Sequence, residues 1–445
     1  MKKTKMLRLV SLLLCLFVLA SCETGGAGNG ETDTNSDVSN ANELVLIANG
    51  QAHCTIVRPK GSNKDMMSLC AELADAIQQN AEVTVEVAAD TKQASEGFVE
   101  ILIGDTNRAE SAQAKEKLGN FEYSISVING KVVIAASDFV MLENAVREFV
   151  SMFTRDSEQS EKNAWTISLD YSKTFDGSGD YAYNSYIGKG FELTVEYTKI
   201  KELSPAQSGP ASNGKMFQYM QGGCTDGTYY YFFMCTGANP QPEKCRILKY
   251  DLATKTRVMV SEELALGHAA DAVYVSDNNT IVVVSGSNNN YYMIDPDTLT
   301  VKETKWISHS GGIAYNPDQK VYITRDENDT LHYMDENFNS LKKIPRENTF
   351  IGFDLSDAST YSGQGITSDG KYIYVLEYQI LESGLRNNLA VYDLSGKFVQ
   401  SIPLDVGCET ENIIIWNDTF YIFCNNSTWT GAQCYQIKLV PQFND

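Results

Sequence analysis

Polar residues stand at the start of four alternating apolar segments in the second half of the chain, and their types could do chemistry. They include amides, an imidazole and carboxyl groups, namely Gln221, His268, Asp271, Gln364, Glu409 and Glu411. An imidazole beside carboxyl groups can perform general acid–base catalysis. Planar amides can instead hydrogen-bond a neutral sugar, with Tyr219 and Tyr361 just upstream for stacking. Either role requires the segment starts to meet in space.

A recurring strand ending indicates how they meet. An aspartate directly follows an apolar or aromatic strand residue four times, at intervals of 44, 40 and 58 residues: Asp251, Asp295, Asp335 and Asp393. Such an aspartate can accept backbone N–H groups of the next turn, and a period of roughly 40 to 50 residues is that of a propeller blade. The pattern predicts a mainly β fold with a C-terminal β-propeller over residues 191–445.

Five blades are predicted from their inner and second strands, which fall at 221–234, 268–284, 312–324, 364–376 and 411–423. The last blade has a third strand at 434–439 but no fourth. We expect the alternating segment 193–198 to supply that outer strand and close the ring, which leaves no open edge. The polar starts then surround one mouth of the central channel, either as a ligand site or as the polar filling of a narrow channel.

Residues 43–172 are predicted to form a separate α/β accessory domain, with a linker at 173–190 before the propeller. Apolar residues recur at helical spacing from Met66 to Ile77 and from Val140 to Val150. Strands at 123–127 and 131–135 read as a hairpin that turns at Asn129-Gly130.

The first 22 residues have the pattern of an export signal, with basic residues before an apolar run that ends in Leu19-Ala20-Ser21-Cys22. This ending resembles the bacterial lipoprotein box, which implies an exported protein that is lipid-anchored through Cys22 to the cell membrane or surface. Residues 23–42 have almost no apolar side chains and are predicted to be a flexible tether. The formal charge of −21 argues against a nucleic-acid partner.

Two further stretches resemble known families. Residues 100–111, EILIGDTNRAES, with the hairpin and helix after them, are similar to the accessory domain that precedes the barrel of bacterial β-hexosaminidases and α-glucuronidases. That resemblance implies a carbohydrate-related context. His268, Asp271, Tyr274 and the blade ending Ile294-Asp295-Pro296 resemble the five-bladed propellers of teichoic-acid biosynthesis protein C and phage receptor-binding proteins. This second resemblance implies binding of a cell-wall or other glycopolymer, although Ala270 and Val275 replace the asparagines usual in that family.

The cysteine spacing leaves disulfides open. Cys235 and Cys245 have the same spacing as Cys424 and Cys434, and an exported protein can form cross-strand disulfides. Equivalent free, buried thiols explain the repeat equally well. The histidines are scattered and no CxxC pair occurs, so no metal and no cofactor are predicted.

The leading hypothesis is non-catalytic binding of a polysaccharide or cell-wall glycopolymer at the propeller mouth. A glycoside hydrolase or polysaccharide lyase acting at the same mouth is one alternative. An envelope scaffold that binds another protein is the other.

Overall fold

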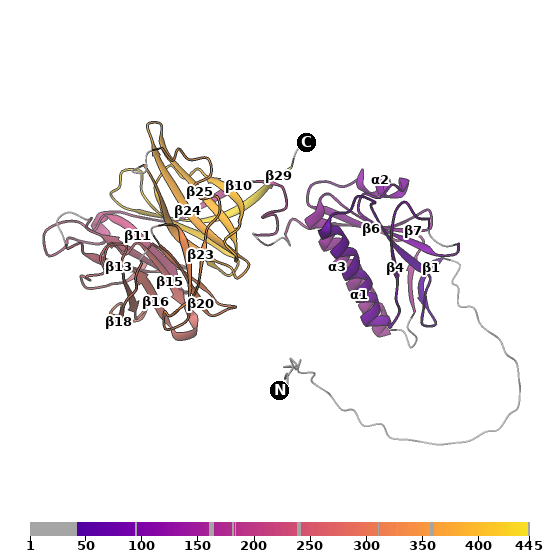
Figure 1. Ribbon diagram of the computed structural model, residues 1–445, viewed down its shortest axis with the longest axis horizontal. Coiled ribbons are helices and arrows are strands. Elements are labelled where there is room, and N and C mark those ends of the chain that lie inside the picture. The colour runs from indigo at the N-terminus through magenta and orange to yellow at the C-terminus, as the bar shows by residue number, and fades with distance from the viewer. Residues whose placement is uncertain are drawn as a thin grey trace, which may run out of the picture.

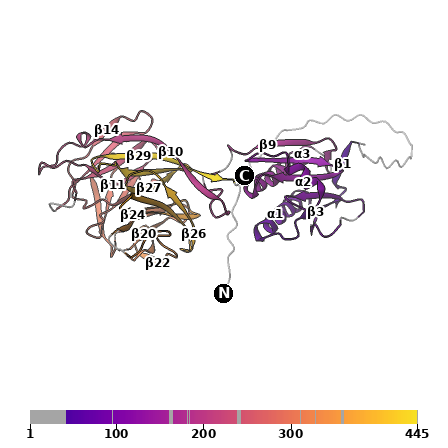
Figure 2. The ribbon, with the colours of Figure 1, turned by 90° about the horizontal axis from the view of Figure 1, so that it is seen from above.

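The computed structural model describes residues 42–93, 96–159, 164–179, 182, 184–237, 242–309, 311–326, 328–356 and 360–443. The predicted export signal, Cys22 and nearly all of the tether lie outside these residues. An α/β part lies beside a larger, all-β part, as seen in Figure 1 and from above in Figure 2. Within the described ranges, no helix is long and apolar enough to cross a membrane.

The α/β part contains a six-stranded sheet in the order β4-β3-β5-β7-β6-β9 and a small sheet in the order β2-β1-β8. Its strands are β1 (Glu43–Ala48), β2 (Gln51–Ala52), β3 (Cys54–Arg58), β4 (Glu86–Ala89), β5 (Val99–Ile103), β6 (Glu122–Ile128), β7 (Lys131–Ala136), β8 (Trp165–Ser168) and β9 (Ser172–Asp176). Its helices are α1 (Lys64–Ala81), α2 (Ala109–Lys115) and α3 (Phe139–Gln159).

Both predicted helices and the hairpin are present, and the apolar faces of α1 and α3 pack in one core with the sheet. Two elements differ from the prediction. Strand β3, which was not predicted, lies in the sheet parallel to both β4 and β5. Strand β9 pairs with β6, so the sheet continues into the first residues of the segment expected to be a linker.

The all-β part has five four-stranded antiparallel sheets within the described residues. The first sheet holds β11 (Tyr219–Thr225), β12 (Tyr229–Cys235), β13 (Cys245–Asp251) and β14 (Arg257–Val260). The second holds β15 (Asp271–Val275), β16 (Thr280–Val284), β17 (Asn290–Ile294) and β18 (Val301–Trp306). The third holds β19 (Ile313–Asn316), β20 (Val321–Arg325), β21 (Thr330–Met334) and β22 (Ser340–Pro345).

The fourth sheet holds β23 (Tyr361–Ser368), β24 (Tyr372–Leu381), β25 (Gly384–Asp393) and β26 (Phe398–Leu404). The fifth holds β27 (Thr410–Trp416), β28 (Thr419–Asn425), β29 (Ala432–Gln442) and β10 (Glu192–Leu203). Short 3₁₀ helices occur at η1 (Pro205–Gln207) and η2 (Ser276–Asn278). The inner strands β11, β15, β19, β23 and β27 contact one another in a closed ring, in which β27 meets β11. The fold is therefore mainly β, with a propeller, as predicted.

The predicted ring closure is confirmed. Strand β10 pairs with β29 along its length, with Thr194 opposite Val440 and Tyr197 opposite Ile437. The strand that enters the propeller is thus the outer strand of its last sheet, and Figure 2 shows β10 and β29 running together. This pairing covers an edge of β29 that would otherwise expose unpaired backbone groups.

The recurring aspartates adopt their predicted turn role, because each accepts a backbone N–H group two or three residues on. The bonds run from Thr254 to Asp251 (2.7 Å), Asp297 to Asp295 (2.9 Å), Asn337 to Asp335 (2.9 Å) and Ser395 to Asp393 (2.8 Å). These turns join the third strand of a blade to its fourth. Since neighbouring strands are antiparallel, the turns lie at the blade end opposite to the inner-strand starts.

The eight cysteines in the described residues are free and buried. Cys235 lies directly opposite Cys245. Cys424 lies opposite Gln433 instead, and Cys434 opposite Phe423. A directly cross-strand disulfide is therefore wrong for the second pair, because the register of β28 and β29 places its members one step apart.

Candidate functional site

A cavity of about 1380 Å³ lies where the inner strands begin. Four of the five predicted ligand-binding residues line it: Gln221, His268, Gln364 and Glu411. Glu409 and the two upstream tyrosines, Tyr219 and Tyr361, line it as well. The predicted convergence of strand starts is thus present in the structure, with aromatic rings beside the polar groups.

Three of these side chains stand in β-bulges of inner strands. Gln221, Gln364 and Glu411 fall within breaks of the pairing register, at Met220/Gly223, Gly363/Ile366 and Thr410/Asn412. A bulge bends its strand and re-aims a side chain. Equivalent positions of β11, β23 and β27 therefore direct an amide, an amide and a carboxyl group toward one cavity.

Close packing of the inner strands explains the glycine after each bulged glutamine. A Cβ on Gly222 would lie 2.8 Å from the carbonyl oxygen of Ala269, and one on Gly365 would lie 2.6 Å from Cα of Asn412. Neither distance leaves room for a side chain, so a Gln-Gly pair suits this position. That repeated pair is the sequence signal for the bulges.

Asp271 is the exception among the predicted site residues, since it does not line the cavity and is 1% exposed. Its Oδ2 accepts the backbone N–H groups of Ile313 (2.9 Å) and Ile366 (3.1 Å). Its Oδ1 accepts the N–H of Ala272 (2.8 Å) and the amide of Asn412. Asp271 therefore joins the inner strands of four blades, and its place is in the structure of the ring. Burial raises its pKa to about 7, against the lowering effect of the backbone donors.

Glu409 and Glu411 form a buried carboxyl pair, 5% and 3% exposed. The Nδ2 of Asn425 donates to Oε2 of Glu409 (3.2 Å) and to Oε1 of Glu411, and Nε2 of Gln364 donates to Oε1 of Glu409 (3.3 Å). Asn425 is oriented by the backbone N–H of Met220, which donates to its Oδ1 (2.8 Å). Burial, followed by the charge of Glu409, raises the pKa of Glu411 well above its usual range.

His268 forms a second acid–base group with Glu243, whose Oε2 lies 2.8 Å from Nδ1 of the imidazole. The carboxyl group is buried, whereas the His268 side chain is 38% exposed and lines the cavity. A carboxyl partner on Nδ1 orients the ring and leaves Nε2 for a ligand. Glu243 was missed because it lies in the loop between β12 and β13 of the neighbouring blade, 25 residues before His268.

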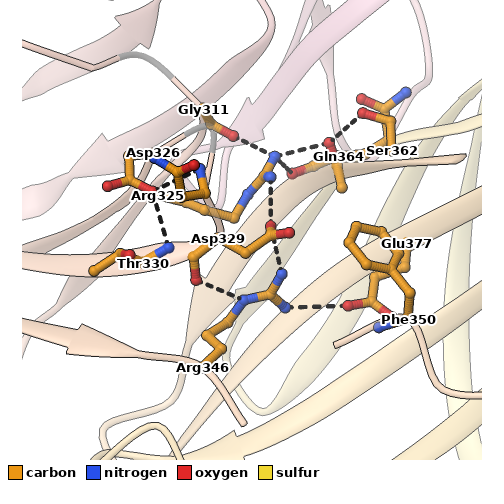
Figure 3. A network of polar contacts seen from close by, with 12 residues as sticks. Gly311, Arg325, Asp326, Asp329, Thr330, Arg346, Phe350, Ser362, Gln364 and Glu377 are labelled. Atoms are coloured by element: carbon orange, nitrogen blue, oxygen red, sulfur yellow. Dashed lines mark hydrogen bonds and ion pairs between the residues drawn. The ribbon is translucent and has the colours of Figure 1, made fainter. Parts of the chain in front are cut away.

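An arginine network holds the bulge of β23, as Figure 3 shows. Nη2 of Arg325 donates to the carbonyl oxygens of Gly311 (2.6 Å), Gly363 (2.7 Å) and Gln364 (3.2 Å). Its Nη1 pairs with Asp329 (3.0 Å), which also pairs with Arg346 (2.6 Å). Arg325 thereby positions Gln364 by binding the backbone of Gln364. Its positive charge is neutralised by Asp329. Arg325, Asp329 and Arg346 were not among the predicted site residues.

The cavity lining carries more acid than base. Its carboxyl residues are Asp326, Asp329, Glu409 and Glu411, whereas its lysine and arginine residues are Lys215 and Arg325. No group of three or more His, Cys, Asp or Glu side chains in the described part of the chain is arranged to hold a metal ion. The side chains that line the cavity can therefore hydrogen-bond a ligand, stack against it and exchange protons with it.

No family model matches this chain, and no curated protein matches it. Three propeller-like solved structures are similar to it at low identity. Myxococcus xanthus glutaminyl cyclase is 12% identical over 56% of this chain and 99% of its own, with a TM-score of 0.37. The tail fiber of a Staphylococcus aureus phage is 14% identical over 57% of this chain and 55% of its own, with a TM-score of 0.38. BamB from Moraxella catarrhalis is 10% identical over 54% of this chain and 100% of its own, with a TM-score of 0.28. The likeness concerns the fold alone.

Proposed function

We propose that the propeller cavity binds a polysaccharide or cell-wall glycopolymer without turning it over, in an exported protein anchored through Cys22. The cavity volume of about 1380 Å³ exceeds the roughly 300–1,000 Å³ of pockets for drug-sized ligands. Several linked sugar units fit such a space better than one small metabolite does.

The observation that carries this proposal is that the Gln221 side chain faces the cavity without a partner among the described residues. Its side chain is 6% exposed, lines the cavity, and has no hydrogen-bond partner among the described residues. The amide of Gln221 is thus left open to the cavity. A ligand hydroxyl or amide can hydrogen-bond Gln221 there, and Tyr219 offers a ring for stacking nearby.

The test is a glycan array probed with the mature chain, followed by calorimetric titration of the selected oligosaccharide. Gln221→Ala and Gln364→Ala should each weaken binding about ten- to a hundredfold, because each removes a hydrogen-bonding group from the cavity. Gln319→Ala is the matched control, since Gln319 is exposed in the turn after β19, at the other end of the blade. Wild-type affinity in both cavity variants would refute the proposal.

The pair of His268 and Glu243 favours a second candidate, a glycoside hydrolase or polysaccharide lyase at the same cavity. A carboxyl-oriented imidazole can act as a general base. This candidate predicts release of shortened products from the bound glycan, lost in His268→Ala while binding persists. Binding without any product would leave the non-catalytic function.

A further inference from the structure

We propose that the glycan bound in this cavity carries a free primary amine, and that Gln221, Glu409 and Glu411 receive its ammonium group. This inference rests on the proposed glycan-binding function and names the class of sugar: an amino sugar that is not N-acetylated. Three observations support it. Among the described residues, the carboxyl pair has no countercharge and Gln221 has no hydrogen-bond partner. The pair and Gln221 also line one cavity.

No described residue supplies a countercharge to the carboxyl pair. Neither Glu409 nor Glu411 forms an ion pair with a lysine, arginine or histidine of the described residues. Their side-chain partners there are Asn425, Gln364, Tyr378 and each other. Arg325, which also lines the cavity, is already paired with Asp329. Burying carboxylates without a cation is costly, and such a group retains a proton instead. A ligand cation could take the place of that proton.

Gln221 supplies a ligand-directed group that is independent of the acids. Its buried side chain, which has no hydrogen-bond partner in the described part of the chain, lies on β11. A neighbour of β11 in the ring is β27, the strand of Glu411. The backbone N–H of Met220 binds the same Asn425 that holds the carboxyl pair. Gln221 and the carboxyl pair therefore line one cavity from neighbouring inner strands.

An ammonium group matches this set of acceptors. It has three donors and no acceptor, and it carries the positive charge that the carboxyl pair lacks. An acetamido group has one N–H donor and no charge, so it satisfies fewer of these atoms. A lysine side chain carries the same cation, but the amides and aromatic rings of the lining favour a sugar.

The experiment compares two oligosaccharides of equal length by calorimetric titration of the mature chain at pH 6. One is a β-1,4-linked glucosamine oligomer with free amines, and the other is its fully N-acetylated counterpart. We expect the free-amine oligomer to bind at least tenfold more tightly. Glu411→Gln, which keeps the shape of the side chain, should abolish that preference, and Gln221→Leu should reduce it. Glu336→Gln, in an exposed turn at the opposite blade end, should preserve it.

Proton release gives a second readout that a merely structural role of Glu411 would not produce. Titration in buffers of different ionisation enthalpy should show release of up to one proton per bound amine, absent in Glu411→Gln. The titratable groups that interact with Glu411 or lie beside it are the following: Glu409, Tyr378, Cys235, Cys408 and Cys424. Tyr378→Phe and Glu409→Gln separate the contributions of the first two.

The outcomes are distinguishable. Equal or tighter binding of the N-acetylated oligomer overturns the ammonium inference and leaves glycan binding intact. Failure of both oligomers, together with an empty glycan array, removes the proposed function and the inference with it. Binding of oligolysine as tightly as the free-amine oligomer overturns the assignment to a sugar.

Discussion

Replacing Asp271 by asparagine should destabilise the propeller strongly, although no ligand contact is lost. Asp271 accepts four donors with its two oxygens, two on each. At pH 5 the buried carboxyl group of Asp271 is protonated, and its hydroxyl oxygen keeps acceptor capacity. The NH₂ group of asparagine faces two of those donors and cannot accept from them. At about 1–3 kcal/mol for each unsatisfied buried group, we expect a loss of about 2–6 kcal/mol at pH 5.

The penalty should shrink as the pH rises. An unfolded aspartate titrates near 3.9, whereas burial raises the pKa of Asp271 to about 7 in the folded protein. The folded state therefore binds the proton more tightly. The contribution of Asp271 to stability is fully present below about pH 4 and is lost as the pH rises through 7. About three pKa units correspond to at most about 4 kcal/mol.

Urea unfolding at pH 5 and pH 8 measures both effects through tryptophan fluorescence, since Trp306, Trp416 and Trp429 report on the propeller. Asp297→Asn, in an exposed turn at the other blade end, is the control and should change stability by about 0.5 kcal/mol or less. A penalty below 1 kcal/mol at pH 5, or one that grows with pH, would refute this account of Asp271.

Two further predictions concern the ends of the chain. Expressed in a bacterial host, the protein should partition into detergent with acyl chains on Cys22, and Cys22→Ala should lose both properties; mass spectrometry that finds another mature N-terminus contradicts this. A chain that begins at Ser204 lacks β10, so it should melt at a lower temperature than one that begins at Gly190 and should aggregate through the exposed edge of β29. Equal melting temperatures would show that β10 does not stabilise the ring.

The architecture was predictable because it repeats. Alternating strands and turn-forming aspartates recur once per blade, and each turn is a local hydrogen bond such as that from Thr254 to Asp251. Ring closure by residues 193–198 was also predictable, because the last blade lacked a fourth strand and its outer edge would otherwise be unpaired. Strand β3 was missed because Cys54–Arg58 is buried almost throughout and shows no clear alternation.

For the site, the sequence predicted which strand starts converge, but not the role of each residue there. The role of Asp271 depends on donors that lie 42 and 95 residues away, which no local pattern reveals. Glu243 and Arg325 act through partners on neighbouring blades, so their roles arise from the ring and not from their own segments. The bulges had a signal in Gln221-Gly222 and Gln364-Gly365, but its meaning depends on how closely the inner strands approach.

The most direct test of the central claim is a crystal structure of the mature chain with an oligosaccharide selected on the glycan array. We expect sugar density inside the cavity, with hydrogen bonds to Gln221 and Gln364 and a ring stacked on Tyr219 or Tyr361. Density on the α/β part or on the outer strands of the blades, with an empty cavity, would contradict it.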